Sequence, residues 1–89
     1  MNRYRPDPDA LAATLTDGAV LLNLRTNRYH SLNATGARVW QLLVEGRNDE
    51  EIIRTMISEF DVTAEVATRE IASIIGALSA AELIIPNDD

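Results

Sequence analysis

Val20, Leu22 and Leu24 alternate with Leu21, Asn23 and Arg25, which is the two-residue period of a β-strand. A short polar turn at Thr26-Asn27 follows, and Asn tolerates the positive φ angle that tight hairpin turns require. The strand pattern resumes over residues 28–32. An earlier apolar run at 11–16 is closed by Asp17-Gly18, a strong hairpin signal. The pattern predicts a three-stranded antiparallel meander with strands at 11–16, 19–25 and 28–32.

From Asn33 onward the hydrophobic residues recur with the period of helices. Asn33 is placed to cap a first helix, which we expect to end near Gly46. Asn48 and Glu51 have the spacing of a capping box at the start of a second helix. Thr63 is placed to cap a third helix that runs to about residue 81. The residues expected to face the core are Ala37, Trp40, Leu43 and Val44 in the first helix, Ile52, Ile53, Met56, Ile57 and Phe60 in the second, and Ala67, Ile71, Ile74, Ile75 and Leu78 in the third.

These elements combine into one small α+β domain. A chain of 89 residues buries roughly 60–68% of its unfolded surface, which is enough for one core. Three strands cannot bury an apolar face alone, so the helices must cover the sheet. The predicted order is β-β-β-α-α-α, with the helices arranged as in a winged helix-turn-helix. We expect a flexible polar lead-in at 1–8, the domain at 9–85 with a short apolar strand near its end, and an acidic tail at 86–89.

Composition narrows the possible functions. The chain has no cysteine and one histidine, so we expect neither a metal site nor a cofactor. The N-terminus lacks the apolar run of a signal peptide, and no stretch approaches the ~20 apolar residues of a membrane span. We therefore expect a cytoplasmic protein with no membrane partner. The net charge of −6 disfavours nucleic acid as a partner, whereas an apolar or basic peptide meets no such penalty.

Three features suggest chemistry, and each has a simpler structural explanation. Tyr29 and His30 invite a catalytic role, but no nucleophile motif accompanies them, so we expect strand residues and no enzyme. The acidic run at 49–51 resembles a metal site, but acids at a helix N-terminus complement the helix dipole. Trp40 resembles an interface anchor, but it lies on the apolar face of the first helix, which favours core packing.

Four motifs, in this order and spacing, give the chain a specific resemblance to one family. They are VLLNLRTNRYHSLN at 20–33, NATGARVWQLL at 33–43, GRNDEEII at 46–53 and EFDV at 59–62. Over about residues 15–85 the chain resembles PqqD-like proteins, the precursor-recognition elements of RiPP biosynthesis. RiPPs are ribosomally made peptides that are modified after translation. The small free-standing form is most similar to the leader-binding proteins of lasso-peptide clusters.

This resemblance implies a peptide-binding function. The leader of a precursor peptide is expected to add as an antiparallel strand to the third strand and to fill a groove beside the third helix. An unpaired sheet edge supports such strand addition on physical grounds as well. The partners that the resemblance implies are the leader peptide, a transglutaminase-like leader peptidase and an asparagine-synthetase-like cyclase. The expected site residues are Arg28, Tyr29, His30, Ser31 and Leu32 on the strand, and Val66, Glu70, Ser73, Ile74 and Ala77 on the helix.

The sequence leaves several alternatives open. Arg25 and Arg28 flank a turn and either solvate it or attract acidic leader residues. Glu70 is either a surface residue or the partner of a basic leader residue. One alternative function is a PqqD-type chaperone for a radical SAM enzyme, which the neighbouring genes would distinguish. Another is a winged-helix DNA-binding regulator, but residues 63–82 hold one Arg against three Glu, and a gel-shift assay tests it.

Overall fold

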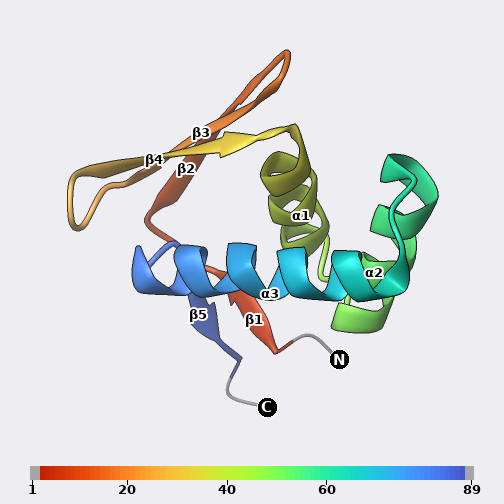
Figure 1. The fold of residues 1–89 in the computed structure, drawn as a ribbon. Coiled ribbons are helices and arrows are strands. Elements are labelled where there is room, and N and C mark those ends of the chain that lie inside the picture. The colour runs from red at the N-terminus through yellow and green to blue at the C-terminus, as the bar shows by residue number, and fades with distance from the viewer. Residues whose placement is uncertain (1–2, 88–89) are drawn as a thin grey trace.

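The computed structural model describes residues 3–87 and contains two small sheets and three helices (Figure 1). The three-stranded sheet lies over α1, and α3 runs across the molecule beneath the sheet. No helix in this part of the chain is long and apolar enough to cross a membrane. In chain order the elements are β1 (Tyr4–Pro6), β2 (Ala10–Leu15), β3 (Gly18–Asn23), β4 (Arg28–Asn33), α1 (Ala34–Val44), α2 (Asp49–Phe60), α3 (Ala64–Ala80) and β5 (Ile84–Pro86).

The predicted meander is confirmed as the antiparallel sheet β2-β3-β4, in which β4 is the predicted third strand. Its first turn differs by one residue from the prediction. Leu15 pairs with Gly18, so the loop is Thr16-Asp17, and Gly18 already belongs to β3. A Cβ atom at Gly18 would lie 2.0 Å from the carbonyl oxygen of Leu32, so the close approach of β4 requires glycine there.

The second turn is longer than predicted. β3 ends at Asn23 rather than at residue 25, and residues 24–27 form the turn. The reason is the buried side chain of Asn23, whose oxygen accepts hydrogen bonds from the backbone N–H groups of Arg25 and Thr26 and bends the chain there. The expected positive φ at Asn27 is confirmed, at 58°.

The helix boundaries follow the predicted caps. Asn33 and Thr63 accept hydrogen bonds from the backbone N–H groups at the starts of α1 and α3. Asn48 and Glu51 form both halves of the predicted capping box of α2. Gly46, with φ of 83°, follows α1 in the left-handed conformation that often ends a helix.

One predicted core position is wrong. Val44, expected to face inward, is 55% exposed. The buried residues Val39, Leu42 and Leu43 define the face of α1 that packs on the core, and at 100° per residue Val44 falls outside that face. Trp40 is buried, which confirms core packing. The buried hydrophobic cluster comprises Leu21, Val39, Trp40, Leu42, Leu43, Ile52, Met56, Ala67, Ile71, Ile75, Leu78, Leu83 and Ile84.

The N-terminal segment also differs from the prediction. Residues 4–6, which we expected within a flexible lead-in, form β1 and pair antiparallel with β5. The next residue, Asp7, is 5% exposed, and both of its carboxylate oxygens accept hydrogen bonds. The predicted apolar terminal strand is β5, and it includes Pro86, which we had placed in the acidic tail. Residues 1–2 and 88–89 lie outside the described part of the chain.

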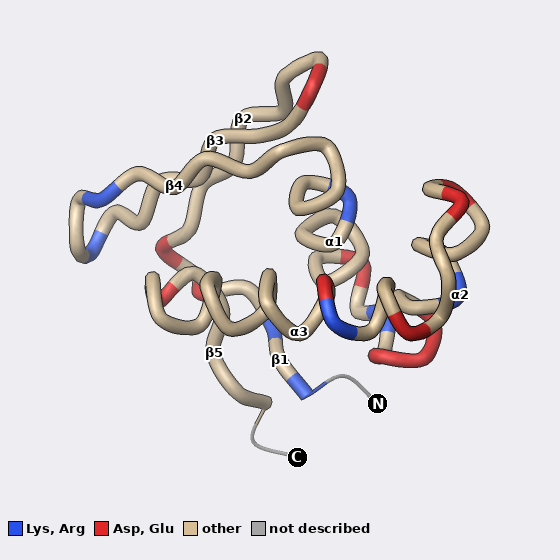
Figure 2. Tube along the Cα trace, viewed as in Figure 1, with Lys and Arg blue, Asp and Glu red and all other residues tan. Residues whose placement is uncertain are grey.

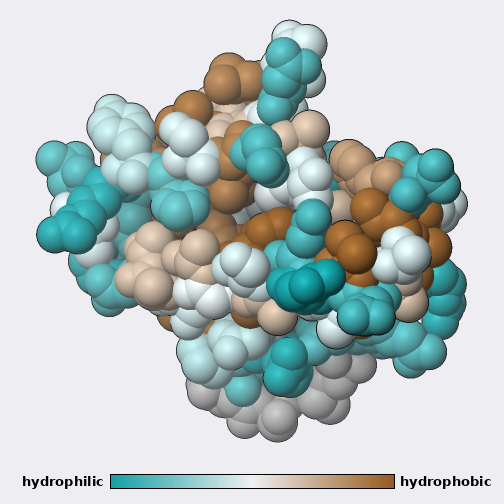
Figure 3. Space-filling view, viewed as in Figure 1, coloured by the Kyte–Doolittle hydropathy of each residue, from teal (hydrophilic) through white to brown (hydrophobic). Residues whose placement is uncertain are grey.

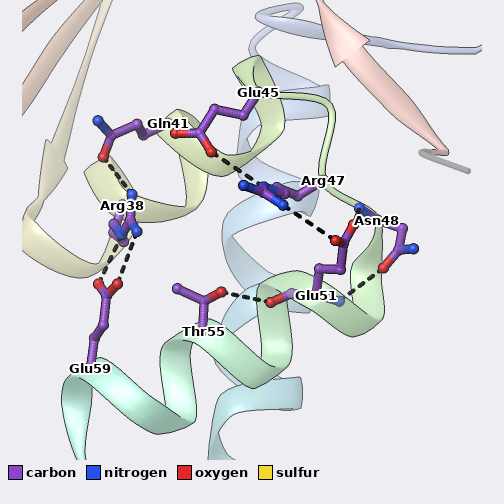
Figure 4. Close-up of polar contacts among 8 residues, drawn as sticks. All are labelled: Arg38, Gln41, Glu45, Arg47, Asn48, Glu51, Thr55 and Glu59. Carbon is purple, nitrogen blue, oxygen red and sulfur yellow. Dashed lines mark hydrogen bonds and ion pairs between the residues drawn. The ribbon is translucent and has the colours of Figure 1, made fainter.

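A bidentate ion pair joins α1 to α2 (Figure 4). Arg38 donates from Nε to Oε1 of Glu59 at 2.8 Å and from Nη2 to Oε2 at 2.9 Å. These hydrogen bonds lower the pKa of Glu59 below its ordinary value of 4.5, against a smaller opposing effect of burial. At the other end of α2, the backbone N–H of Asn48 lowers the pKa of Glu51. The Arg38–Glu59 pair therefore stabilises the folded state only while Glu59 is ionised.

We expect the substitution Glu59→Gln to destabilise the protein by about 0.5–1 kcal/mol near pH 7, the usual contribution of a partly exposed ion pair. Because the folded pKa lies below the unfolded one, this difference should be complete above pH 4.5 and should vanish as the pH falls through the lowered pKa. Urea denaturation of both proteins between pH 3 and 8 measures it. Glu50→Gln, which breaks the more exposed Glu50–Arg54 pair, is the control and should change stability less. A pH-independent difference for Glu59→Gln would contradict the role of the ion pair.

Candidate functional site

The candidate site begins at an unpaired sheet edge. β4 is the last strand in the order β2-β3-β4, and within residues 3–87 it pairs only with β3. It therefore presents one row of backbone N–H and C=O groups that no strand satisfies. Such a row is the template for adding a peptide strand.

The register shows which groups are free. Leu24 donates its N–H to the carbonyl of Asp9 at 2.9 Å. Asp9 and Leu24, which extend the ladder of β2 and β3 by one residue, are therefore a hydrogen-bonded pair. Such pairs recur at every second residue of an antiparallel ladder. Residues 18, 20 and 22 therefore bond toward β2, and residues 19, 21 and 23 bond toward β4. The bond from the Asn27 N–H to the Asn23 carbonyl (2.7 Å) agrees with this alternation.

The backbone groups of β4 follow from that alternation. Arg28, His30 and Leu32 bond to β3, whereas Tyr29 and Ser31 direct their N–H and C=O groups to the open edge. The side chains alternate as well. His30 and Leu32 share the inner face with the buried Leu21 and are half-buried, whereas Tyr29, 74% exposed, and Ser31 lie on the opposite face.

The predicted helical residues form one stripe along α3, at positions 66, 70, 73 and 77. This stripe lies beside the buried stripe that carries Ala67, Ile71, Ile75 and Leu78. Glu70, Ser73 and Ala77 are exposed, and Val66 is half-buried. Ile74 lies between the two stripes, is half-buried, and packs against the core. The stripe is therefore available for contact.

Figure 1 shows α3 and β4 running in opposite directions, and in the same view Figure 3 shows hydrophobic residues between the two elements. Leu32 from the strand and Ile74 from the helix are partly buried, and both pack on the core cluster. The facing segments carry no Asp, Glu, Lys or Arg at residues 29–33 and 71–81, and Figure 2 shows the charges near the ends of both elements. The predicted strand and helix residues therefore come from two elements with uncharged middles, Arg28 and Glu70 lie outside these uncharged segments, and the side chains of Tyr29 and Ser31 point to the other sheet face.

An adjoining pocket of about 180 Å³ was not predicted from the sequence. The pocket lies where α1 begins, next to the end of β4, and Glu70 of α3 is one of its lining residues. The sequence placed Met56 and Phe60 in the core and Val62 in a link, so no local signal pointed to an opening there. The lining residues are Thr35, Met56, Phe60, Val62, Ala67, Glu70 and Ile71.

The two arginines near the second turn differ in role. Arg25 donates to the carboxylate of Asp7 at 2.8 Å and 3.1 Å and lies 3.8 Å from the carboxylate of Glu82. Arg25 is therefore already paired within the protein, although its side chain is exposed. Arg28 is exposed and makes no ion pair with any residue in the described range. Of the two, Arg28 is the one available to a ligand.

Asn23 links the turn before β4 to the segment that follows α3. Its Nδ2 donates to the carbonyl of Glu82, just after α3, at 2.7 Å, while its Oδ1 holds the turn that leads into β4. The side chain is 1% exposed, so these bonds form away from water. In the sequence Asn23 is only one polar position of an alternating strand. Its buried role has no local signal, because the acceptor of its amide N–H lies 59 residues away.

The described residues contain no group of three or more His, Cys, Asp or Glu side chains that could hold a metal ion. His30 lies half-buried in β4, and no hydrogen bond joins it to a nucleophile within residues 3–87. What this surface offers chemically is backbone pairing and apolar contact.

Known proteins share the sequence pattern and the fold of this chain. The family model described as coenzyme PQQ synthesis protein D (PqqD) matches residues 18–84. A solved complex of TbiB1 with the TbiA(beta) leader peptide is 33% identical with a TM-score of 0.87, covering 96% of this chain and 99% of that chain. A lasso peptide synthetase B1 complexed with the leader peptide is 30% identical with a TM-score of 0.84, covering 94% and 99%. A search of curated protein sequences found no match.

We expect Asn23→Ala to destabilise the fold by about 1–3 kcal/mol, because it leaves two N–H groups and one carbonyl without their partner. Guanidinium denaturation measures the change. Asn27→Gly in the same turn is the control, because glycine adopts the positive φ of Asn27 freely and should change stability little. Equal losses from both substitutions would show that the turn, rather than the Asn23 amide, matters.

Proposed function

The chain belongs to the PqqD family, and from this premise we propose that it binds the leader segment of a ribosomally made precursor peptide and delivers the precursor to a processing enzyme. The observation that carries the proposal is the unpaired edge of β4 beside the uncharged surface of α3. The leader peptides bound to the two similar structures support it.

The leader adds as an antiparallel strand to β4. The N–H and C=O groups of Tyr29 and Ser31 bond to its backbone, and each bond contributes about 0.5–1.5 kcal/mol net. These bonds do not distinguish one sequence from another, so specificity comes from side chains. Every second leader side chain points toward α3, where Ser73 and Ala77 are small enough to let the peptide approach closely.

The direction of the strand follows from this pairing. A leader antiparallel to β4 runs parallel to α3, since β4 and α3 run in opposite directions. Its N-terminal part then meets the pocket beside Thr35 and Glu70, which suits an apolar anchor side chain. Its C-terminal part passes Arg28. In this arrangement Arg28 is available to an acidic leader residue and Glu70 to a basic one.

In this proposal the protein has no catalytic activity and uses no cofactor or metal. It acts in the cytoplasm. Its partners are the leader, a transglutaminase-like leader peptidase and the asparagine-synthetase-like cyclase of a lasso-type pathway. The description of the matching family as a coenzyme PQQ synthesis protein favours a second candidate, a peptide chaperone for a radical SAM enzyme. The similar leader complexes favour a role in lasso-peptide biosynthesis, and the genes beside this one would distinguish this role from that of a radical SAM chaperone.

Titration of the isotope-labelled protein with the leader encoded beside it tests the proposal. The largest chemical-shift changes are expected at residues 28–32 and 66–77, and the leader should stay uncleaved. Changes confined to α2, with both of these segments silent, would place the site elsewhere. Cleavage that survives repurification and protease inhibitors would contradict a non-catalytic role.

On the strand, we expect Ser31→Pro to weaken leader binding at least tenfold, because it removes an edge-facing N–H and its ring crowds the incoming peptide. Ser31→Ala is the control and should bind within about twofold of the wild type, because the backbone groups remain. His30→Pro instead removes a bond to β3 and should lower stability. Fluorescence anisotropy with labelled leader and thermal denaturation separate these effects. Equal binding by Ser31→Pro and Ser31→Ala would refute strand addition at this edge.

On the helix, we expect Ala77→Phe to block the leader without unfolding the protein, because Ala77 is exposed on the α3 stripe. Ala72→Phe puts the same ring at an exposed position on the other side of α3 and should leave binding unchanged. Ile71→Asp should unfold the domain, because it buries a charge in the core. The same anisotropy titration and circular dichroism measure these outcomes. Full leader binding by Ala77→Phe would remove α3 from the site.

A further inference from the structure

The sheet face that points away from the helices is unusually apolar. We call it the outer sheet face; the strand register assigns to it Leu11, Ala13, Leu15, Val20, Leu22, Tyr29 and Ser31. The alternation follows from Leu21, which is fully buried on the inner face, so its neighbours along β3 point the other way. Leu11, Leu15 and Tyr29 are 53%, 56% and 74% exposed. Large exposed hydrophobic residues are thus concentrated on one sheet surface.

The outer sheet face carries no charge, although the chain has 22 charged residues. Figure 2 shows the charged positions of the two hairpins at their turns rather than along the strands. Solvation alone would favour polar residues on an exposed sheet face, as on most half-buried antiparallel sheets. An uncharged apolar surface marks a contact with another apolar surface.

The size of this face indicates the kind of contact. Strands of six residues rise about 20 Å, and three strands span about 14 Å, which gives a face of about 300 Å². A stable interface buries about 800 Å² on each partner. A second copy of this chain paired only through this face would therefore not form a lasting dimer. A transient partner with an uncharged apolar surface fits better.

The outer sheet face is continuous with the proposed leader edge. Tyr29 and Ser31 present their side chains on this face and their backbone groups to the leader. A leader added beside β4 extends the sheet by one strand, and every second leader side chain then joins the outer sheet face. A protein docked there contacts the carrier and the bound leader together.

We infer that the outer sheet face, enlarged by the bound leader, is the docking surface for the enzyme that processes the precursor. This inference rests on the proposed function and assigns that function a second surface, separate from the α3 side. The enzyme docks through an uncharged apolar patch. It binds the leader-loaded protein more tightly than the empty one, because only the loaded sheet has four strands.

The test uses the full chain, its leader and the leader peptidase encoded beside it. The double variant Leu11→Thr/Leu15→Thr keeps strand-forming residues but makes the far end of the face polar. Val44→Thr is the matched control, because Val44 is equally exposed, at 55%, but lies at the end of α1. Surface plasmon resonance measures peptidase binding with and without leader, and anisotropy measures leader binding separately.

We expect the double variant to bind leader normally and peptidase at least tenfold more weakly, and Val44→Thr to bind both within twofold of the wild type. If the double variant unfolds, Leu15→Thr alone, at the hairpin end, replaces it. Unchanged peptidase binding by the sheet variants, or a wild-type dimer that they dissociate in light scattering, would overturn the inference. Failure of the wild type to bind leader would contradict the proposed function instead, since peptidase binding is also measured without leader.

Discussion

A three-stranded sheet has two open edges, and the helices of this protein cover one face of the sheet without closing either edge. This constraint determines much of the molecule. The core forms between the inner face and three helices, with α1 at its centre. The edge-facing backbone groups of Tyr29 and Ser31 in β4 are left without a strand partner within residues 3–87. An unpaired edge invites uncontrolled strand pairing, which proteins limit with short strands and charged ends. β4 has six residues and an arginine at its start.

Hydrogen bonds between residues far apart in the sequence link the segments at the ends of β4, α3 and β1. Asn23 binds the carbonyl of Glu82, and Arg25 binds Asp7, whose own N–H bonds to the carbonyl of Leu83. These bonds tie the turn before β4 to the segment after α3 and to the end of β1. The far end of the groove is held differently, because Asn33 ends β4 and caps α1. Asn23 thus links the start of β4 to the end of α3, and Asn33 links the end of β4 to the start of α1.

Local signals predicted most of the secondary structure. Caps at Asn33, Asn48 and Thr63 and the left-handed Asn27 depend on neighbours within three or four residues, so they can be recognised in the sequence. The pairing of β1 with β5 could not be predicted in this way, because it joins opposite ends of the chain. The same holds for Asn23 and for the pocket beside Thr35, which exist only after packing. The structure places the predicted site residues on β4 and α3, with the side chains of Tyr29 and Ser31 on the outer face of the sheet, and their role in leader binding stays a prediction.

The pairing of β1 with β5 has a consequence for how this domain can be joined to others. Tyr4 and Pro86 are cross-strand partners, so the chain enters and leaves the fold at the same place. Figure 1 shows this small sheet on the side of α3 that faces away from β2, β3 and β4. A second protein domain linked at either end, or at both, would emerge there without covering β4. The architecture thus suits a module that can be inserted into, or appended to, a larger polypeptide by gene fusion while its peptide-facing side stays open.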